Sequence, residues 1–322
     1  MQLGAGLMGA AEKSCPKKRH FAKGKMSMRT HDADPVDPSG LDSALEGYSL
    51  EVTAKDANSL RGVGEDIPPN TAISVTFLPG EEMDARVAAA KLVRSLGFEP
   101  VPHISARRLR STDEFKEYLR RLRDAAAIKR VFAIAGDLSA PLGPYEDALA
   151  IIQSAELLES GVKQVSISGY PEGHPQISDA KLWEALRTKY RVLKERGTNV
   201  EVMTQFSFDA APVLRWLARL RQELDITATV RVGLPGPASV KTLLRFASIC
   251  GVSATAGVMA KYGVAITQLL SSAGPQRLLS AYLEQLRPAV HGSVRFHFYP
   301  FGGLKNTVSW VESNRELVQQ DA

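Results

Sequence analysis

The chain has 322 residues, of which 44% are hydrophobic and 23% are charged, as in an ordinary globular protein. No apolar run approaches the ~18 residues of a membrane-spanning helix, so we expect no membrane partner. The two cysteines, Cys15 and Cys250, lie too far apart in sequence to suggest a disulfide framework or a cysteine metal site, and we expect a cytoplasmic protein.

The net charge of +5 comes from the N-terminal segment. Residues 1–31 contain Glu12 as their acid and seven basic residues: Lys13, Lys17, Lys18, Arg19, Lys23, Lys25 and Arg29. The rest of the chain has 33 basic and 34 acidic residues, so its charge gives no reason to expect nucleic-acid binding. We predict a disordered basic leader and linker over residues 1–46. A targeting peptide or a later start, at Met26 or Met28, is the alternative.

Short segments rich in Val, Ile, Phe and Thr, bounded by turn residues, predict eight strands. They lie at residues 48–53, 72–76, 99–104, 130–135, 163–168, 199–205, 226–232 and 294–299. Amphipathic stretches predict helices at 81–96, 112–126, 143–159, 178–196, 209–223, 238–250 and 275–287. Thr112 is placed to act as the N-cap of the second helix.

Strands that alternate with helices predict a parallel sheet, and eight strands can close it into a barrel. An open doubly wound sheet is the alternative. However, the first strand runs into Thr53-Ala54-Lys55-Asp56, without the glycine-rich phosphate-binding turn of such folds. We therefore predict a (β/α)8 TIM barrel as one domain over residues 47–322.

Polar motifs follow several predicted strands, where a barrel of this kind builds its active site. Two hexapeptides stand out, Tyr170-Pro171-Glu172-Gly173-His174-Pro175 and Thr204-Gln205-Phe206-Ser207-Phe208-Asp209. They resemble the Y-P-E-x-H-P and T-Q-x-x-F-D motifs of the methylenetetrahydrofolate reductases, in the same order and at similar spacing. The resemblance covers about residues 48–312. It implies an oxidoreductase of one-carbon metabolism that reduces 5,10-methylenetetrahydrofolate to 5-methyltetrahydrofolate with NAD(P)H, or runs the reverse reaction.

The resemblance also implies roles for individual residues. Glu51 matches the family's general acid, whose pKa an apolar barrel mouth would raise. Asp137 and Gln205 match residues that hold the pterin ring; from the residues alone they could be a turn or cap residue and a loop amide. The substrate site would further include Tyr299, and Phe206 and Phe208 could pack in the core or form a wall against the ring. The positions around a flavin would be Thr76, His103, Gly136, Tyr145, Tyr170 and His174. From the residues alone, Glu51 could equally be a solvent-facing strand carboxylate or a partner of Lys55.

The expected cofactors are NAD(P)H and, by resemblance, FAD, but the positions that hold flavin phosphates are altered. Ala135 stands where the family usually has an arginine, and its Arg-Lys pair falls near Val192 and Leu193. The helical residues Arg187, Lys189, Arg191 and Lys194 could substitute, or could form a solvated face. A branch of the family passes hydride directly from the nicotinamide to the folate, and this chain could belong to it.

Other functions stay open on the same barrel. A methyltransferase-like or folate-binding protein without reductase activity is the main alternative, and a metal-dependent lyase is another. We expect no metal site, because His103, His174 and His297 lack clustered ligand spacing. The near-C-terminal Gly302-Gly303 could approach an anion or form a plain turn. The expected partner is a small tetrahydrofolate derivative, and a homo-oligomer remains open.

Overall fold

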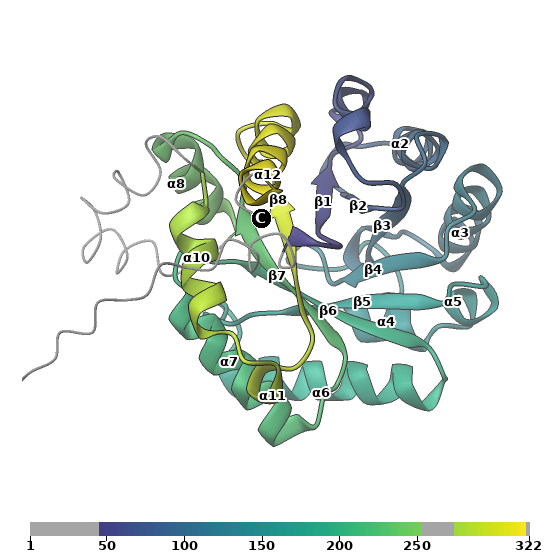
Figure 1. Cartoon of the computed structure of the whole chain (residues 1–322). Coiled ribbons are helices and arrows are strands. Elements are labelled where there is room, and N and C mark those ends of the chain that lie inside the picture. Colours follow the sequence, from purple (N-terminus) through teal and green to yellow (C-terminus); the bar gives the residue numbers. More distant parts are fainter. Residues whose placement is uncertain (1–44, 251, 253–273, 320–322) are drawn as a thin grey trace, which may run out of the picture. The chain divides into compact units, whose positions relative to one another are not determined.

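A computed structural model describes residues 45–250, 252 and 274–319 (Figure 1). The predicted leader lies outside these residues, apart from Leu45 and Glu46. Leu45 is fully buried in the main hydrophobic cluster, and the backbone oxygen of Glu46 accepts a hydrogen bond from Arg295 Nη1 at 2.8 Å. The packed core therefore already includes residue 45. In the described part of the chain, no helix is both long and apolar enough to cross a membrane.

Eight parallel strands close into a barrel in sequence order, which confirms the predicted fold. The strands are β1 Ser49–Val52, β2 Ala72–Val75, β3 Glu99–Ser105, β4 Arg130–Ile134, β5 Gln164–Gly169, β6 Asn199–Phe206, β7 Thr229–Pro235 and β8 Val294–Tyr299. The ring closes where β1 pairs with β8, and this seam has only two residue pairs, Ser49 with His297 and Leu50 with Phe298. The seventh strand begins three residues later than the range predicted from sequence.

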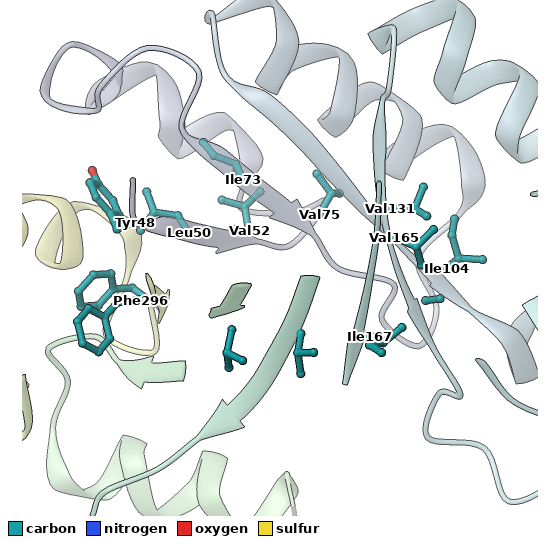
Figure 2. Packing of buried hydrophobic residues seen from close by; sticks show 14 of the residues in the cluster. Tyr48, Leu50, Val52, Ile73, Val75, Ile104, Val131, Val165, Ile167 and Phe296 are labelled. Carbon is teal, nitrogen blue, oxygen red and sulfur yellow. The ribbon is translucent and has the colours of Figure 1, made fainter. Parts of the chain in front are cut away.

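Alternation along the strands separates the core into two regions. Leu50 and Val52 of β1 point outward into the main hydrophobic cluster, together with Ile73 and Val75 of β2 (Figure 2). The intervening residues of β1, Ser49 and Glu51, point into the barrel. The barrel interior also holds a small apolar cluster of Ala72, Val101, Phe132 and Met203.

Helices surround the barrel (Figure 1). They are α2 Met83–Ser95, α3 Thr112–Ala126, α4 Ala148–Gln153, α5 Ala155–Glu159, α6 Asp179–Glu195, α7 Ala210–Leu224, α8 Val240–Ile249, α10 Gln276–Gln285, α11 Pro288–His291 and α12 Leu304–Gln319. The short 3-10 helices are η1 Ala57–Gly62, η2 Gly64–Asp66 and η3 Ala106–Arg108. The single helix predicted at 143–159 is wrong: Ser154 is extended and its hydroxyl caps α5, so α4 ends before it.

A buried ion pair lies in the amino-terminal half of the barrel. Glu201 Oε1 of β6 is 2.8 Å from Arg231 Nε of β7, and both side chains are less than 10% exposed. Arg231 Nη1 also donates to the backbone oxygen of Gly47 at 2.9 Å, and the Ser166 hydroxyl donates to Glu201 at 3.3 Å. The pair therefore joins three strands to the segment that enters β1.

Candidate active site

Glu51 points into the barrel near the carboxyl end of β1. Its side chain is 19% exposed, and its Oε2 lies 3.6 Å from Nε2 of His103 on β3. Burial raises the pKa of Glu51 to about 8 and lowers the pKa of His103 to about 3. Burial therefore favours the neutral form of both groups, and their contact is not an ion pair at neutral pH. This position excludes the solvent-facing alternative for Glu51.

Several buried polar atoms on or just after strands β2, β3 and β8 have no hydrogen-bond partner among the described residues. They are His103 Nε2, His297 Nε2, Thr76 Oγ1 and Ser105 Oγ. The other ring nitrogen of His297 is 2.8 Å from the Ser49 hydroxyl, and the His103 ring meets Phe132 edge-on at 4.9 Å. Buried polar atoms normally have partners, so this group can receive polar atoms of a ligand or water.

Aromatic side chains form one wall of the mouth. Tyr299 donates its hydroxyl to the backbone oxygen of Thr204 at 3.0 Å, and its ring lies 5.7 Å from that of Phe206. Phe208 meets Phe206 edge-on at 5.6 Å. Burial and then the Glu51 carboxyl raise the pKa of Tyr299. The structure thus brings Tyr299, Phe206 and Phe208 together, and Tyr299 is the one of them whose pKa responds to Glu51.

Residues of both motif hexapeptides line a recess at the carboxyl ends of β5 and β6. Its lining residues are Tyr170, Pro171, Glu172, Gly173, His174, Gln205, Phe206, Ser207, Cys250 and Val252. Tyr170 and His174 meet edge-on at 5.6 Å, and Gln205 Oε1 accepts a hydrogen bond from the Phe206 N–H at 3.1 Å. Burial raises the pKa of Cys250 to about 11, and the Glu51 carboxyl adds to this shift. Cys250 therefore lines the recess and is also close enough to Glu51 for that carboxyl to affect the pKa of its thiol.

Asp137 occupies a more open position after β4. Its side chain is 62% exposed and lies 2.7 Å from Arg108 Nη2, and Arg108 Nε also donates to it at 2.9 Å. Gly136 has φ +91°, and a Cβ there would lie 2.2 Å from the Ser105 hydroxyl. Only glycine fits this turn. The described charged partner of Asp137 is thus an arginine of the loop after β3.

Tyr145 and the α6 cations lie apart from the group around Glu51. The Tyr145 ring packs 5.4 Å from Phe115 of α3, and its hydroxyl donates to Glu156 of α5 at 3.2 Å. It belongs to the main hydrophobic cluster between barrel and helices. The structure does not bring it to the residues that surround Glu51.

Two of the α6 cations lie near carboxylates of their own helix. Arg187 lies 3.6 Å from Glu184, and Arg191 lies 3.9 Å from Glu195. Burial lowers the pKa of Lys189 to about 8, which the Asp147 carboxylate partly opposes.

Sequence reasoning missed three contributors to the mouth. Arg108 is 29 residues from Asp137 in the sequence, and Cys250 is 199 residues from Glu51. No local sequence pattern connects the members of either pair. Glu81 is the third: its Oε1 accepts from the Ala54 N–H at 3.1 Å, and its Oε2 accepts from the Leu78 N–H at 2.9 Å. It therefore joins the loop after β1 to the loop after β2.

Two smaller features bear on ligands. A Cβ at Gly302 would lie 2.0 Å from the backbone oxygen of Pro237, so close packing against the loop after β7 accounts for this glycine. Among the described residues, no group of three or more His, Cys, Asp or Glu side chains could hold a metal ion.

These features define a (β/α)8 barrel with an enclosed carboxyl group and unpartnered polar atoms at the carboxyl ends of its strands. The family model described as methylenetetrahydrofolate reductase matches residues 63–301, and the chain belongs to this family. The match begins after β1, so Glu51 lies outside it.

Two curated relatives are both described as 5,10-methylenetetrahydrofolate reductase. The one from Buchnera aphidicola subsp. Baizongia pistaciae is 29% identical over 165 residues, which cover 51% of this chain and 52% of the relative. The one from Pectobacterium carotovorum subsp. carotovorum is 26% identical over 191 residues, 56% of this chain and 58% of the relative. The chain thus matches little more than half the length of each.

A solved structure supports the fold. It is an uncharacterized protein from Clostridium thermocellum that binds two copies of 5-methyl-5,6,7,8-tetrahydrofolic acid. The likeness has a TM-score of 0.50 and covers 87% of this chain and 99% of that one. At 11% identity it concerns the fold alone.

Proposed function

We propose that the chain reduces 5,10-methylenetetrahydrofolate to 5-methyltetrahydrofolate with a reduced nicotinamide as the electron source. The observation that carries this proposal is the carboxyl group of Glu51, which is enclosed in the barrel mouth with its pKa raised to about 8. A carboxylic acid that keeps its proton near neutrality is what the first step of this reaction requires. Membership of the family supports the substrate class.

The role of Glu51 follows from the chemistry of the substrate. The methylene carbon bridges N5 and N10 of the folate. When Glu51 donates its proton to N10, the bond from N10 to the methylene carbon breaks and N5 keeps the carbon as an iminium. A hydride then adds to that carbon and gives the 5-methyl product. Glu51 must regain a proton from solvent before the next turnover.

The surrounding residues would orient the two reactants. Gln205 and Asp137 would hold the pterin ring, with Phe206, Phe208 and Tyr299 along its sides. The buried atoms without partners on Thr76 and His103 could receive polar groups of the hydride donor. Tyr170 and His174, which line the recess, would contact the same donor. Enclosure by these groups holds the reactants in place and excludes water, which supplies much of the rate acceleration.

The residues at the expected phosphate positions do not fit a tightly held flavin dinucleotide. Ala135 carries no charge, and Val192 and Leu193 stand where the family has its Arg-Lys pair, with Leu193 buried in the core. Arg187 and Arg191 are exposed on α6, near Glu184 and Glu195. Phosphate groups are held by cationic side chains, which these positions lack. We therefore propose direct hydride transfer from NADH or NADPH to the folate. Flavin absorbance in the visible spectrum of the purified, active protein would contradict this part of the proposal.

Replacement of Glu51 tests the function. Glu51→Gln keeps the shape of the side chain but has no acidic proton, so we expect turnover to fall by roughly 100-fold or more. Affinity for 5-methyltetrahydrofolate, measured by calorimetry, should stay nearly unchanged. The matched control is Glu65→Gln, an exposed carboxyl of η2, which should leave both unchanged. A wild-type protein that binds folate without turnover would instead support a folate-binding or methyltransferase-like barrel.

A further inference from the structure

Glu51 has no cationic partner for the state that it reaches when its proton has moved to the substrate. Burial is the cause of its raised pKa. In the described part of the chain, its contact with an ionisable side chain is with His103 rather than with an arginine or a lysine. The ionised carboxylate would therefore be a buried charge without compensation, which is strongly unfavourable. A hydrogen-bond donor beside the carboxyl group would lower this cost.

His103 on β3 is placed to supply that donor. Its Nε2 atom lies 3.6 Å from Oε2 of Glu51, and Nε2 has no hydrogen-bond partner among the described residues. The ring meets Phe132 edge-on at 4.9 Å. A distance of 3.6 Å is too long for a formed hydrogen bond, but such contacts in ligand-free enzymes often shorten when the substrate binds.

The neutral state of His103 suits this role. Burial lowers its pKa to about 3, and a neutral imidazole still carries one N–H group. A cation at this place would favour the ionised form of Glu51 and would remove the proton before the substrate arrives. A neutral N–H group supports the carboxylate less strongly than a cation does, so Glu51 can keep its proton until N10 of the folate takes it.

We propose that His103 is a positioning residue for the acid: its Nε2–H group donates a hydrogen bond to Oε2 of Glu51, which leaves the transferable proton on Oε1 and supports the carboxylate that forms. No proton leaves His103 in this step, because the proton that reaches N10 comes from Glu51. In this arrangement Thr76 Oγ1 is left for the hydride donor, and His103 Nε2 serves Glu51 instead. The assignment rests on the proposed function.

Two other ionisable side chains lie near Glu51, and neither is as well placed to donate. The Tyr299 hydroxyl already donates to the backbone oxygen of Thr204 at 3.0 Å, and the Cys250 thiol is a weak donor. Burial raises the pKa of both groups, and the Glu51 carboxyl adds to each shift. Both groups are therefore uncharged at neutral pH.

His297 on β8 lies near His103 and is also neutral. Its pKa is lowered by burial and then by the charges of Arg231 and His103. Its Nδ1 atom is 2.8 Å from the Ser49 hydroxyl, and Arg231 pairs with Glu201. A second positive charge in this region would be unfavourable, which agrees with a neutral His103.

Two substitutions of His103 test the contact through the pH–rate profile. His103→Leu removes the donor, so we expect kcat to fall by roughly 10- to 100-fold with little change in KM for the folate. The ionised form of Glu51 also loses its hydrogen bond, so the upper limb of the kcat/KM profile should move up by about 1 pH unit. His103→Gln keeps an N–H donor near the position of Nε2 and should restore most of the turnover and the original limb.

The direction of the pH shift distinguishes this role from a structural one. Damage that admits water to the mouth would lower the pKa of Glu51 toward its ordinary value of 4.5 and would move the limb down. The matched control is His291→Leu. His291 is another buried histidine, and its Nδ1 accepts a hydrogen bond from the Arg287 N–H at 2.9 Å at the end of α11. This control should leave the limb and the kcat of the folded protein unchanged.

Nitrogen NMR of histidine-labelled protein provides a second readout, which holds even if His103→Leu folds poorly. Comparison of the wild type with His103→Gln identifies the His103 ring, and we expect a proton on Nε2 and none on Nδ1 at neutral pH. The opposite tautomer, or a limb that stays or moves down in His103→Leu, would overturn the role of His103 in an active reductase. Full turnover in Glu51→Gln, or none in the wild type, would overturn the proposed function as well.

Discussion

Glu51 and His103 are neutral for the same reason, since burial opposes charge on either side chain. Because the pKa of Glu51 is raised to about 8, its protonated fraction falls as the pH rises through that value. We predict that kcat/KM for the reductive reaction is level below pH 8 and then falls by about tenfold per pH unit. A pH–rate profile measures this. A profile that stays level well above pH 8 would exclude Glu51 as the proton donor.

The same shift has a consequence for stability. The pKa of Glu51 rises from 4.5 in the unfolded chain to about 8 in the folded protein, so the folded state holds this proton more tightly. The stabilisation associated with the proton is complete below pH 4.5 and is lost as the pH rises through 8. Glu51→Gln should therefore exceed the wild type in stability at pH 9 by roughly 2–4 kcal/mol, and match it at pH 4. Urea denaturation at both pH values checks this. An equal difference at both would contradict it.

At the residue scale, the sequence could predict that Glu51 and Gln205 lie near the carboxyl ends of β1 and β6, because each stands at the end of a recognisable strand segment. The proximity of Arg108 to Asp137 could not be predicted, since it depends on how two loops meet in three dimensions. The N-cap of α3 was also mispredicted. Ser111 accepts the hydrogen bond from the Glu114 N–H, and Thr112 is already helical. Adjacent hydroxyl residues cannot be distinguished as caps from sequence alone.

At the element scale, all eight strands were predictable because each is short, apolar and followed by turn residues. The break between α4 and α5 was not, since Gln153-Ser154 carries neither glycine nor proline, and α12 was not predicted at all. Its residues begin directly after the Gly302-Gly303 turn, which drew attention to a loop. Boundaries set by tertiary packing are the least predictable from local sequence.

The loops after β1 and β2 provide a test at this scale. Glu81→Ala would leave the N–H groups of Ala54 and Leu78 without their carboxylate acceptor. We expect a loss of about 1–2 kcal/mol in urea unfolding and slower turnover, because Ala54 follows Glu51 by three residues. Glu82→Ala, at the exposed neighbouring position, serves as the control. Unchanged turnover in Glu81→Ala would show that the link does not position Glu51.

For the molecule as a whole, the two halves of the barrel have different tasks. Removal of Glu201 would leave Arg231 charged and buried without its partner, so Glu201→Ala should cost about 3–5 kcal/mol of stability. The kcat of the folded fraction should not change, because the pair lies in the half opposite the mouth. Glu117→Ala, which removes an exposed pair with Arg120, should not shift Tm measurably. A large fall in kcat for Glu201→Ala would contradict this separation.

The narrow seam between β1 and β8 also bears on when, during synthesis of the chain, Glu51 acquires its raised pKa. A ribosome delivers β1 first, and its partner across the seam, beginning at Val294, follows only after more than 240 further residues. Until then we expect the nascent chain to present Glu51 to water, where a glutamate titrates as an ordinary carboxylic acid. We therefore expect Glu51 to acquire its raised pKa only near the end of translation. In a truncated polypeptide without β8, the pKa of Glu51 should be close to that of an ordinary glutamate.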